Sequence, residues 1–299
     1  MTSTKSKAAA ISITSNTLLI SMKLVAGLIT GSVSLIAEAI HSTMDLAAAV
    51  IAFICVRISD KPVDKNHPYG HGKAENISGV IEGVLILIAA GIIVNESIHK
   101  IIEGTELKIV EVGIVIMAIS IVVNVVVSRH LLKVAKATDS LALEADAAHL
   151  TTDVLTMSGV LIGLVAVKLT GIEIIDPIVA IMVALLIVKA GIQIIAKSFG
   201  GLMDTSLPES EKAAIEKCIL EHSNQLVGFH ELRTRKSGSQ RQIDLHLVLH
   251  KTVSVEDAHK LCDHLEADIG NILPNAITNI HVEPCDSSCK QCIGKKDNQ

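Results

Sequence analysis

The sequence predicts an α-helical membrane protein in which six transmembrane helices precede a small α+β domain. Long apolar runs dominate roughly the first two thirds of the 299-residue chain, whereas the last third mixes polar and apolar residues. A bilayer core of about 30 Å requires about 20 mostly apolar residues per helix. The stretches that meet this requirement are 8–30, 33–57, 76–99, 109–132, 141–168 and 176–198.

Lysine and arginine concentrate on one side of these predicted spans, while the opposite connections carry few basic residues. The positive-inside rule therefore predicts that both termini are cytoplasmic. The first apolar stretch is too long for a cleavable signal peptide, which favours a first membrane span. The lack of targeting signals and the compact loops favour a prokaryotic inner (cell) membrane. The basic residues on the cytoplasmic side are Lys5, Lys7, Arg57, Lys61, Lys65, Lys73, Arg129, Lys133 and Lys136.

The last third predicts an independent domain in the order helix, strand, strand, helix, strand. This order is typical of an α+β (ferredoxin- or metallochaperone-like) layer in which helices cover one face of a sheet. Ser254 is expected to cap the second helix. The expected elements are 208–221, 229–235, 242–250, 255–269 and 276–283. The predicted organisation is a transport domain at 1–205, a cytoplasmic metal-binding domain at 206–285 and a flexible cysteine-containing tail at 286–299.

Composition excludes some functions and favours others. The net charge is −5 and no basic stripe is interleaved with aromatic residues, so nucleic acid is not an expected partner. Thirteen histidines and 31 carboxylates supply ligands for metal ions. The chain has no H-E-x-x-H motif, which metalloproteases use to place a general base beside their metal. We therefore expect no enzymatic activity.

Two predicted spans repeat the pattern H-x-x-x-D. His41 and Asp45 lie in the second span, and His149 and Asp153 lie in the fifth. Residues four apart share one helix face. A carboxylate near the centre of a membrane helix costs at least ~2.5 kcal/mol, so two such pairs require compensation. Two imidazoles and two carboxylates converging from two helices form a tetrahedral site that zinc accepts. The alternative is that each histidine only hydrogen-bonds its own aspartate.

Other polar residues extend the set of candidate ligands. Asp64, His67 and His71 lie close together in a glycine-containing connection that can fold around a cation. A solvated loop that holds two histidines by chance is the alternative. Glu82, in the third span, is predicted to hydrogen-bond to a neighbouring helix.

Histidines also gather in the predicted α+β domain. His281 and Glu283 are two residues apart and hence lie on one face of a strand. The alternative is that these residues are merely polar surface groups. The candidate cytoplasmic ligands are His230, His246, His259, His281 and Glu283.

The cysteines fall into two groups. Cys285, Cys289 and Cys292 have C-x3-C-x2-C spacing but no evident fourth ligand, so a flexible thiol-bearing tail is favoured over metal capture. The other three lie in apolar helical patterns and are expected to be packing residues. These are Cys55, Cys218 and Cys262.

These motifs together resemble the cation diffusion facilitator family over nearly the whole chain. The resemblance rests on T-G-S-V-S-L-I-A-E-A-I-H-S-T-M-D (30–45), D-K-N-H-P-Y-G-H-G-K-A-E (64–75), H-L-T-T-D (149–153), G-L-M-D (201–204) and H-V-E-P-C (281–285). It implies a homodimeric metal/proton antiporter with a transport site at the two H-x-x-x-D pairs, a second site in the loop and a dinuclear cytoplasmic site. It also implies a dimer-stabilising salt bridge between Lys73 and Asp204.

The expected function is therefore Zn2+/H+ antiport across a lipid membrane by alternating access. The His-Asp/His-Asp set is the one that goes with zinc preference in the resembled family. Zinc is expected both as the transported ion and at regulatory or structural sites, with Cd2+, Fe2+ or Mn2+ as other candidate ions. Two alternatives stay open: an exporter of Mn2+ or Fe2+, and a membrane metal sensor or scaffold that moves no ions.

Overall fold

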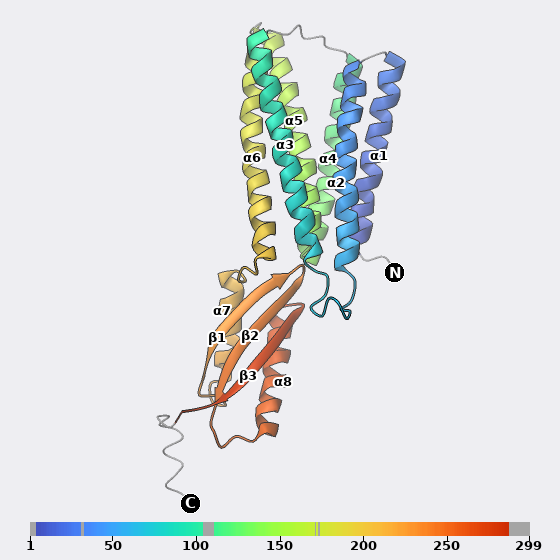
Figure 1. Ribbon diagram of the computed structural model, residues 1–299. Coiled ribbons are helices and arrows are strands. Elements are labelled where there is room, and N and C mark those ends of the chain that lie inside the picture. The colour runs from blue at the N-terminus through green and yellow to red at the C-terminus, as the bar shows by residue number, and fades with distance from the viewer. Residues whose placement is uncertain (1–3, 31–32, 104–110, 171, 173, 287–299) are drawn as a thin grey trace, which may run out of the picture. The chain divides into compact units, whose positions relative to one another are not determined.

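The computed structural model describes the chain except for residues 1–3, 31–32, 104–110, 171, 173 and 287–299 (Figure 1). It divides into two compact units, Met1–Gly200 and Gly201–Gln299. The first unit is helical and the second contains a three-stranded sheet with two helices. Each unit is described by itself below.

The described part of the first unit consists of six long helices, which confirms the predicted helical membrane domain. Four of them contain candidate membrane spans by length and apolar composition among the described residues: Thr4–Ile29, Ala74–Ile102, Ile114–Thr138 and Pro177–Leu202. The other two, α2 and α5, carry the H-x-x-x-D pairs. The helices are α1 (Thr4–Thr30), α2 (Val33–Ser59), α3 (Ala74–Glu103), α4 (Glu111–Thr138), α5 (Leu141–Thr170) and α6 (Ile175–Leu202).

Small residues allow the helices of this unit to approach closely. Ala8, Ala135 and Ala142 are buried beside Leu131 and Leu143, which joins α1, α4 and α5 in one apolar cluster. Such small-residue contacts are typical of helix packing in membranes, where apolar burial itself drives little association. Large apolar side chains elsewhere point outward and give these helices an apolar outer surface suited to lipid. Examples are Leu18, Val126, Leu185 and Leu169.

The carboxylate of Glu75 ties several helices together at one end of this unit. Glu75, at the start of α3, is fully buried. It accepts hydrogen bonds from Lys5 Nζ at 2.9 Å, from Ser59 Oγ at 2.9 Å and from Ser140 Oγ at 2.6 Å. Its partners therefore come from α1, from α2 and from the residue before α5. The sequence placed Glu75 in a family motif but did not indicate this structural role.

The second unit confirms the predicted α+β order. The sheet has the order β1-β2-β3, with β1 antiparallel and β3 parallel to the central strand β2. Ser254 caps α8 as predicted, since its Oγ accepts a hydrogen bond from the Asp257 N–H at 3.1 Å. The elements are α7 (Glu209–Glu221), β1 (Gly228–Ser237), β2 (Gln240–Leu249), α8 (Val255–Ile272) and β3 (Ala276–Pro284).

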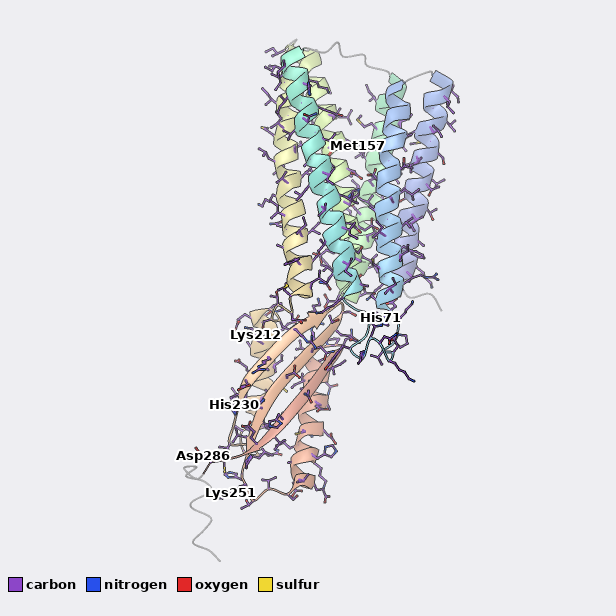
Figure 2. All side chains as sticks on the ribbon, viewed as in Figure 1. His71, Met157, Lys212, His230, Lys251 and Asp286 are labelled. Carbon is purple, nitrogen blue, oxygen red and sulfur yellow. The ribbon has the colours of Figure 1, made fainter. Side chains whose placement is uncertain are left out.

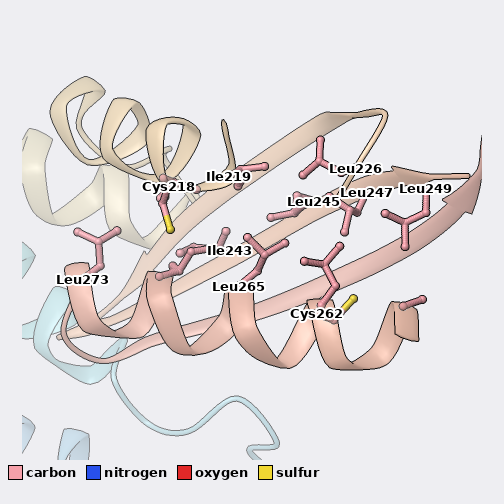
Figure 3. Packing of buried hydrophobic residues seen from close by; sticks show 14 of the residues in the cluster. Cys218, Ile219, Leu226, Ile243, Leu245, Leu247, Leu249, Cys262, Leu265 and Leu273 are labelled. Atoms are coloured by element: carbon pink, nitrogen blue, oxygen red, sulfur yellow. The ribbon is translucent and has the colours of Figure 1, made fainter. Parts of the chain in front are cut away.

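Helices α7 and α8 cover the same face of the sheet (Figure 3). Leu245, Leu247 and Leu249 alternate along β2 and lie in one core with residues of both helices, including Ile219 and Leu265. Cys218 and Cys262 belong to this core, as predicted for packing residues. Because successive strand residues point to opposite faces, the intervening His246 points to the face that α7 and α8 leave uncovered.

The end of the second unit places one of the three clustered cysteines. Cys285 is buried, and its backbone N–H donates to the Leu249 carbonyl oxygen at 2.7 Å, so it extends the sheet beyond β3. Cys289 and Cys292 lie outside the described residues. The prediction of a flexible tail is therefore wrong for Cys285, which is fixed in the folded domain. The role of the other two cysteines stays a prediction.

Candidate metal sites

The first candidate site lies between α2 and α5 in the helical unit. Asp45 comes from α2, and His149 and Asp153 lie one turn apart on α5. Each of these three residues offers a ligand atom, and the three atoms lie within 4.8 Å of one another. The His149 Nε2 atom lies 3.2 Å from Asp45 Oδ1. The side chain of His41 lies outside the described residues, so its place at this site stays a prediction.

The contact between Asp45 and His149 joins the two motifs rather than closing each motif on itself. The alternative that each histidine serves only its own aspartate is therefore wrong for His149, whose ring bonds to the aspartate of the other helix. His149 is 6% exposed, which places this polar contact in the interior of the helical unit. Asp153, Asp45 and Glu82 all act electrostatically on its ring. An excess of carboxylates around a buried imidazole favours a cation at this position.

The contact between His149 and Asp45 places a proton between the two side chains. One proton bridges His149 Nε2 and Asp45 Oδ1. The other ring nitrogen, Nδ1, is buried and has no hydrogen-bond partner among the described residues. A metal ion that binds Nε2 must displace that proton. A metal ion and this proton therefore compete for the same ring nitrogen.

Two further carboxylates are buried in the same unit. Asp146, on α5, accepts a hydrogen bond from Ser12 Oγ of α1 at 3.2 Å. Glu82 accepts one from Ser78 Oγ, four residues earlier on its own helix, at 3.3 Å. The predicted hydrogen bond from Glu82 to a neighbouring helix is therefore not found among the described residues. One oxygen of each carboxylate, Asp146 Oδ2 and Glu82 Oε2, has no partner there.

The second candidate site lies in the connection between α2 and α3, where Figure 2 labels His71. Asp64 Oδ1 lies 3.1 Å from His67 Nδ1, and Asp64 Oδ2 lies 3.3 Å from His71 Nε2. Their donor atoms form one of the groups that could hold a metal ion. The two imidazole centroids are 4.2 Å apart. The three predicted loop ligands thus lie together, although the side chains of His67 and Asp64 are 55% and 50% exposed. Metal binding by this loop stays a prediction.

Backbone N–H groups orient the carboxylate of Asp64 and favour its ionised form. Its Oδ1 accepts hydrogen bonds from the backbone N–H groups of His67 and Asn66 at 2.8 and 2.9 Å. The bond from the His67 backbone is the largest cause that holds the pKa of Asp64 below its ordinary value of 3.8. This carboxylate is therefore ionised at neutral pH, and the local turn fixes its direction.

The third candidate site crosses the three strands of the second unit. The register pairs His230 of β1 with His246 of β2, and His246 with His281 of β3. Three histidines therefore stand side by side, with ring centroids 5.2 Å apart for the first pair and 4.8 Å apart for the second. Figure 2 labels His230 on this sheet.

Glu283 connects two of these histidines. Its Oε2 lies 3.1 Å from His230 Nε2, and its Oε1 lies 3.0 Å from His246 Nδ1. The bond to His246, and secondarily the bond to His230, hold the pKa of Glu283 below its ordinary value of 4.5 against the opposing effect of desolvation. His230, His246 and Glu283 supply two nitrogens and one oxygen within 4.8 Å of one another. This donor set fits zinc.

The structure does not bring all five predicted cytoplasmic ligands together. The His281 Nε2 atom lies 3.8 Å from Glu283 Oε1, at the edge of the cluster. His259 lies on α8, which covers the opposite face of the sheet, and contacts Asp263 at 3.6 Å. Glu231, which the sequence did not single out, lies at a β-bulge with a φ of 53° and has its Oε2 3.8 Å from His246 Nε2.

Replacing Glu283 with glutamine is expected to weaken zinc binding at the strand cluster by about tenfold or more, because the amide removes the anionic ligand. Equilibrium dialysis of the purified chain against buffered Zn2+ measures this change. The pKa of Glu283 is lowered in the folded chain, so its carboxylate is ionised above its ordinary pKa of 4.5 and strengthens zinc binding there. This contribution to zinc binding is lost only as the pH falls through the lower pKa of the folded chain. Between pH 7 and 6, zinc binding is therefore expected to weaken by the same factor in the unmodified chain and in Glu283→Gln.

A fourth group of ligands was not predicted. His222, at the C-terminal end of α7, lies with His264 and Asp268 of α8 in another arrangement that could hold a metal ion. The sequence carried part of the signal, since His264 and Asp268 have the same H-x-x-x-D spacing as the membrane pairs.

The predicted salt bridge between Lys73 and Asp204 joins residues of different units and stays a prediction. Within the second unit, Asp204 Oδ2 lies 3.3 Å from Arg235 Nη1. This carboxylate therefore already has one cationic partner.

Comparison with known proteins decides the family. A model described as the cation efflux transmembrane domain matches residues 9–203, and one described as the cation efflux protein, cytoplasmic domain, matches residues 207–285. The chain belongs to the cation efflux family. This assignment confirms the resemblance to cation diffusion facilitators. As in the family, a helical membrane domain precedes a small cytoplasmic domain.

Similar proteins of the cation efflux family occur in bacteria. The uncharacterized transporter sll1263 of Synechocystis sp. is 35% identical over 263 residues, which cover 88% of this chain and 85% of that protein. The cation-efflux pump FieF of Pectobacterium atrosepticum is 32% identical over 263 residues, covering 88% and 87%. A solved structure of the putative zinc transporter CzrB in its zinc form matches 27% of this chain and 92% of its own, with 35% identity and a TM-score of 0.26.

Proposed function

We propose that the chain exports divalent metal ions, with Zn2+ as its main cargo, and exchanges them for protons by alternating access. The observation that carries this proposal is the convergence of Asp45, His149 and Asp153 from α2 and α5 inside the helical unit. Family membership supports transport of cations. It also argues against an enzyme, since the cation-efflux pumps among its relatives are transporters.

Charge supports the exchange. A divalent ion neutralises the two carboxylates, and its release leaves them uncompensated in a poorly solvated interior, which is a costly state. Protons are the available replacement. The proton between His149 Nε2 and Asp45 Oδ1 occupies the position that a metal would take, because both atoms are candidate ligands. Binding of the metal and of this proton at Nε2 is therefore mutually exclusive. Their movements are coupled when the displaced proton leaves the site rather than moving to Nδ1 of the same ring.

The donor chemistry favours zinc over the other ions. The described ligands are one imidazole nitrogen and two carboxylates, and His41 is proposed to add a second imidazole. Two nitrogens and two oxygens form the tetrahedral set that zinc accepts. Mn2+ and Fe2+ tolerate the same donors and are the alternative cargoes, with Cd2+ as a further candidate.

The cytoplasmic domain supports a homodimer. The sheet face that carries His230, His246 and Glu283 is not covered by α7 or α8, so it is open to a second copy of the chain. His259 lies on the other side of its own sheet and would reach this cluster only from a second copy. We propose that the strand and loop sites bind zinc for regulation or stability. The proposed domains are a transport domain at 1–205, a cytoplasmic metal-binding domain at 206–285 and a cysteine-containing tail at 286–299. In the inner membrane of a prokaryote, both termini would be cytoplasmic.

The test is metal uptake by vesicles reconstituted with the purified chain. Uptake of Zn2+ is expected to exceed uptake of Mn2+, Fe2+ and Cd2+ and to be accompanied by counterflow of protons. Replacing Asp153 with alanine is expected to abolish zinc uptake, because it removes one of the three described ligands. The matched control is Glu144→Ala on the same helix, whose carboxylate pairs with Lys197 at 2.6 Å and is 40% exposed.

The outcomes separate the competing functions. Zinc uptake that persists in Asp153→Ala would show that the central ligands are wrongly assigned. Uptake without proton counterflow would exclude antiport but not export. A membrane sensor or scaffold would bind zinc with the same ligands and give no uptake in any variant.

A further inference from the structure

The group formed by His222, His264 and Asp268 lies away from the strand cluster. His222 follows the last residue of α7, while the other two residues lie one turn apart on α8. These helices cover the face of the sheet opposite to His246. The group is therefore built from a different layer of the domain and shares no residue with the strand cluster.

One carboxylate oxygen faces both imidazoles. Asp268 Oδ2 lies 3.3 Å from His222 Nε2 and 3.4 Å from His264 Nε2. Zinc binds nitrogen and oxygen at about 2.0–2.2 Å, so two ligands at the tetrahedral angle lie about 3.4 Å apart. Both distances match this separation. The two rings meet edge to face with centroids 5.2 Å apart, which leaves both Nε2 atoms near the same carboxylate.

The ring of His222 is already oriented for binding. Its Nδ1 lies 3.1 Å from the Cys218 carbonyl oxygen, and because a carbonyl only accepts, Nδ1 is the donor. Metal-binding histidines commonly donate one ring N–H to a backbone carbonyl while the other nitrogen binds the ion. The side chain of His222 is only 13% exposed, so packing also restricts its rotation.

The other side of the group is open to solvent. The side chain of His264 is 65% exposed and that of Asp268 is 36% exposed. An ion could therefore enter from water without unfolding the domain. A water molecule could complete a four-coordinate shell around two nitrogens and one oxygen.

We propose that His222, His264 and Asp268 form an additional binding site for a divalent transition-metal ion, with Zn2+ as the fitting ion. An ion there joins the end of α7 to α8, the two helices that cover the sheet. Occupancy therefore stabilises this helical layer independently of the strand cluster and of the membrane site.

The test measures zinc bound to the full-length chain in detergent after the other groups have been removed. The background variant disrupts each of the other groups at two positions: Asp45→Ala with His149→Ala, Asp64→Ala with His71→Ala, and His246→Ala with Glu283→Ala, together with Cys289→Ser and Cys292→Ser. It is expected to retain about one Zn2+ per chain in equilibrium dialysis. Adding Asp268→Ala, or separately His222→Ala, is expected to remove that ion. The matched control is Glu266→Ala, an exposed carboxylate on the same helix.

Co2+ provides a second measurement that depends on coordination. The background variant is expected to give the visible absorption of tetrahedral Co2+, and Asp268→Ala is expected to lose it while its far-UV circular dichroism is unchanged. A background variant that binds no Zn2+, or an unchanged ion count after Asp268→Ala, would overturn the proposal. Vesicle uptake does not enter this test, so failure of the site and failure of the proposed transport are distinguishable.

Discussion

Replacing Glu75 with alanine is expected to lower the stability of the helical unit by about 3–5 kcal/mol, because it leaves a buried charge network without its central acceptor. Lys5, whose side chain is 12% exposed, would keep only Asp60 at 3.7 Å among its described ionic partners. Ser59 and Ser140 would lose the same acceptor. Titration with SDS in mixed micelles, followed by circular dichroism, measures the difference in the free energy of unfolding.

The control for Glu75 is a carboxylate that is equally well paired but exposed. Glu144 binds Lys197 at 2.6 Å on the surface of the unit, where the two side chains are 40% and 57% exposed. Exposed pairs contribute about 0–1 kcal/mol, so Glu144→Ala is expected to change stability little. Equal losses of unfolding free energy in Glu75→Ala and Glu144→Ala would mean that burial of the Glu75 network adds nothing to stability.

Local patterns predicted most of the fold. The apolar runs gave all six helices, since their lengths match those of membrane spans. Alternation of apolar residues and the cap at Ser254 gave the order of the second unit. The same alternation placed His281 and Glu283 on one face of a strand. These features depend on residues close together in the sequence, which is why a single chain reveals them.

Features that depend on tertiary contacts were not predictable. The alignment of His230 with His246 depends on strand register, and a bulge between His230 and Arg233 shifts that register. Glu75 gains its role because residues from four parts of the chain meet there. His264 and Asp268 showed a recognisable spacing, but only the packing of α7 against α8 brings His222 to them. His259 and Asp263 have the same spacing on the same helix, but they belong to none of the groups of described residues that could hold a metal ion.

Exchanging His149 for aspartate is expected to shift transport from Zn2+ towards Mn2+. Carboxylate oxygens suit Mn2+ better than imidazole does, whereas imidazole suits zinc. The variant would surround the ion with the carboxylates of Asp45, Asp153 and the new aspartate. We expect the ratio of zinc to manganese uptake to fall by on the order of tenfold, from the preference of harder ions for oxygen. Parallel uptake assays in the same vesicles measure this ratio.

The matched control for this exchange is His130→Asp, an exposed histidine near the end of α4. It introduces the same charge into the same unit away from the candidate ligands, so the uptake ratio should stay unchanged. An unchanged ratio in a His149→Asp variant that still transports would exclude His149 as the source of zinc preference. Selectivity would then depend on the size of the site or on His41. A changed ratio at position 149 alone would place the choice of ion at the contact between α2 and α5.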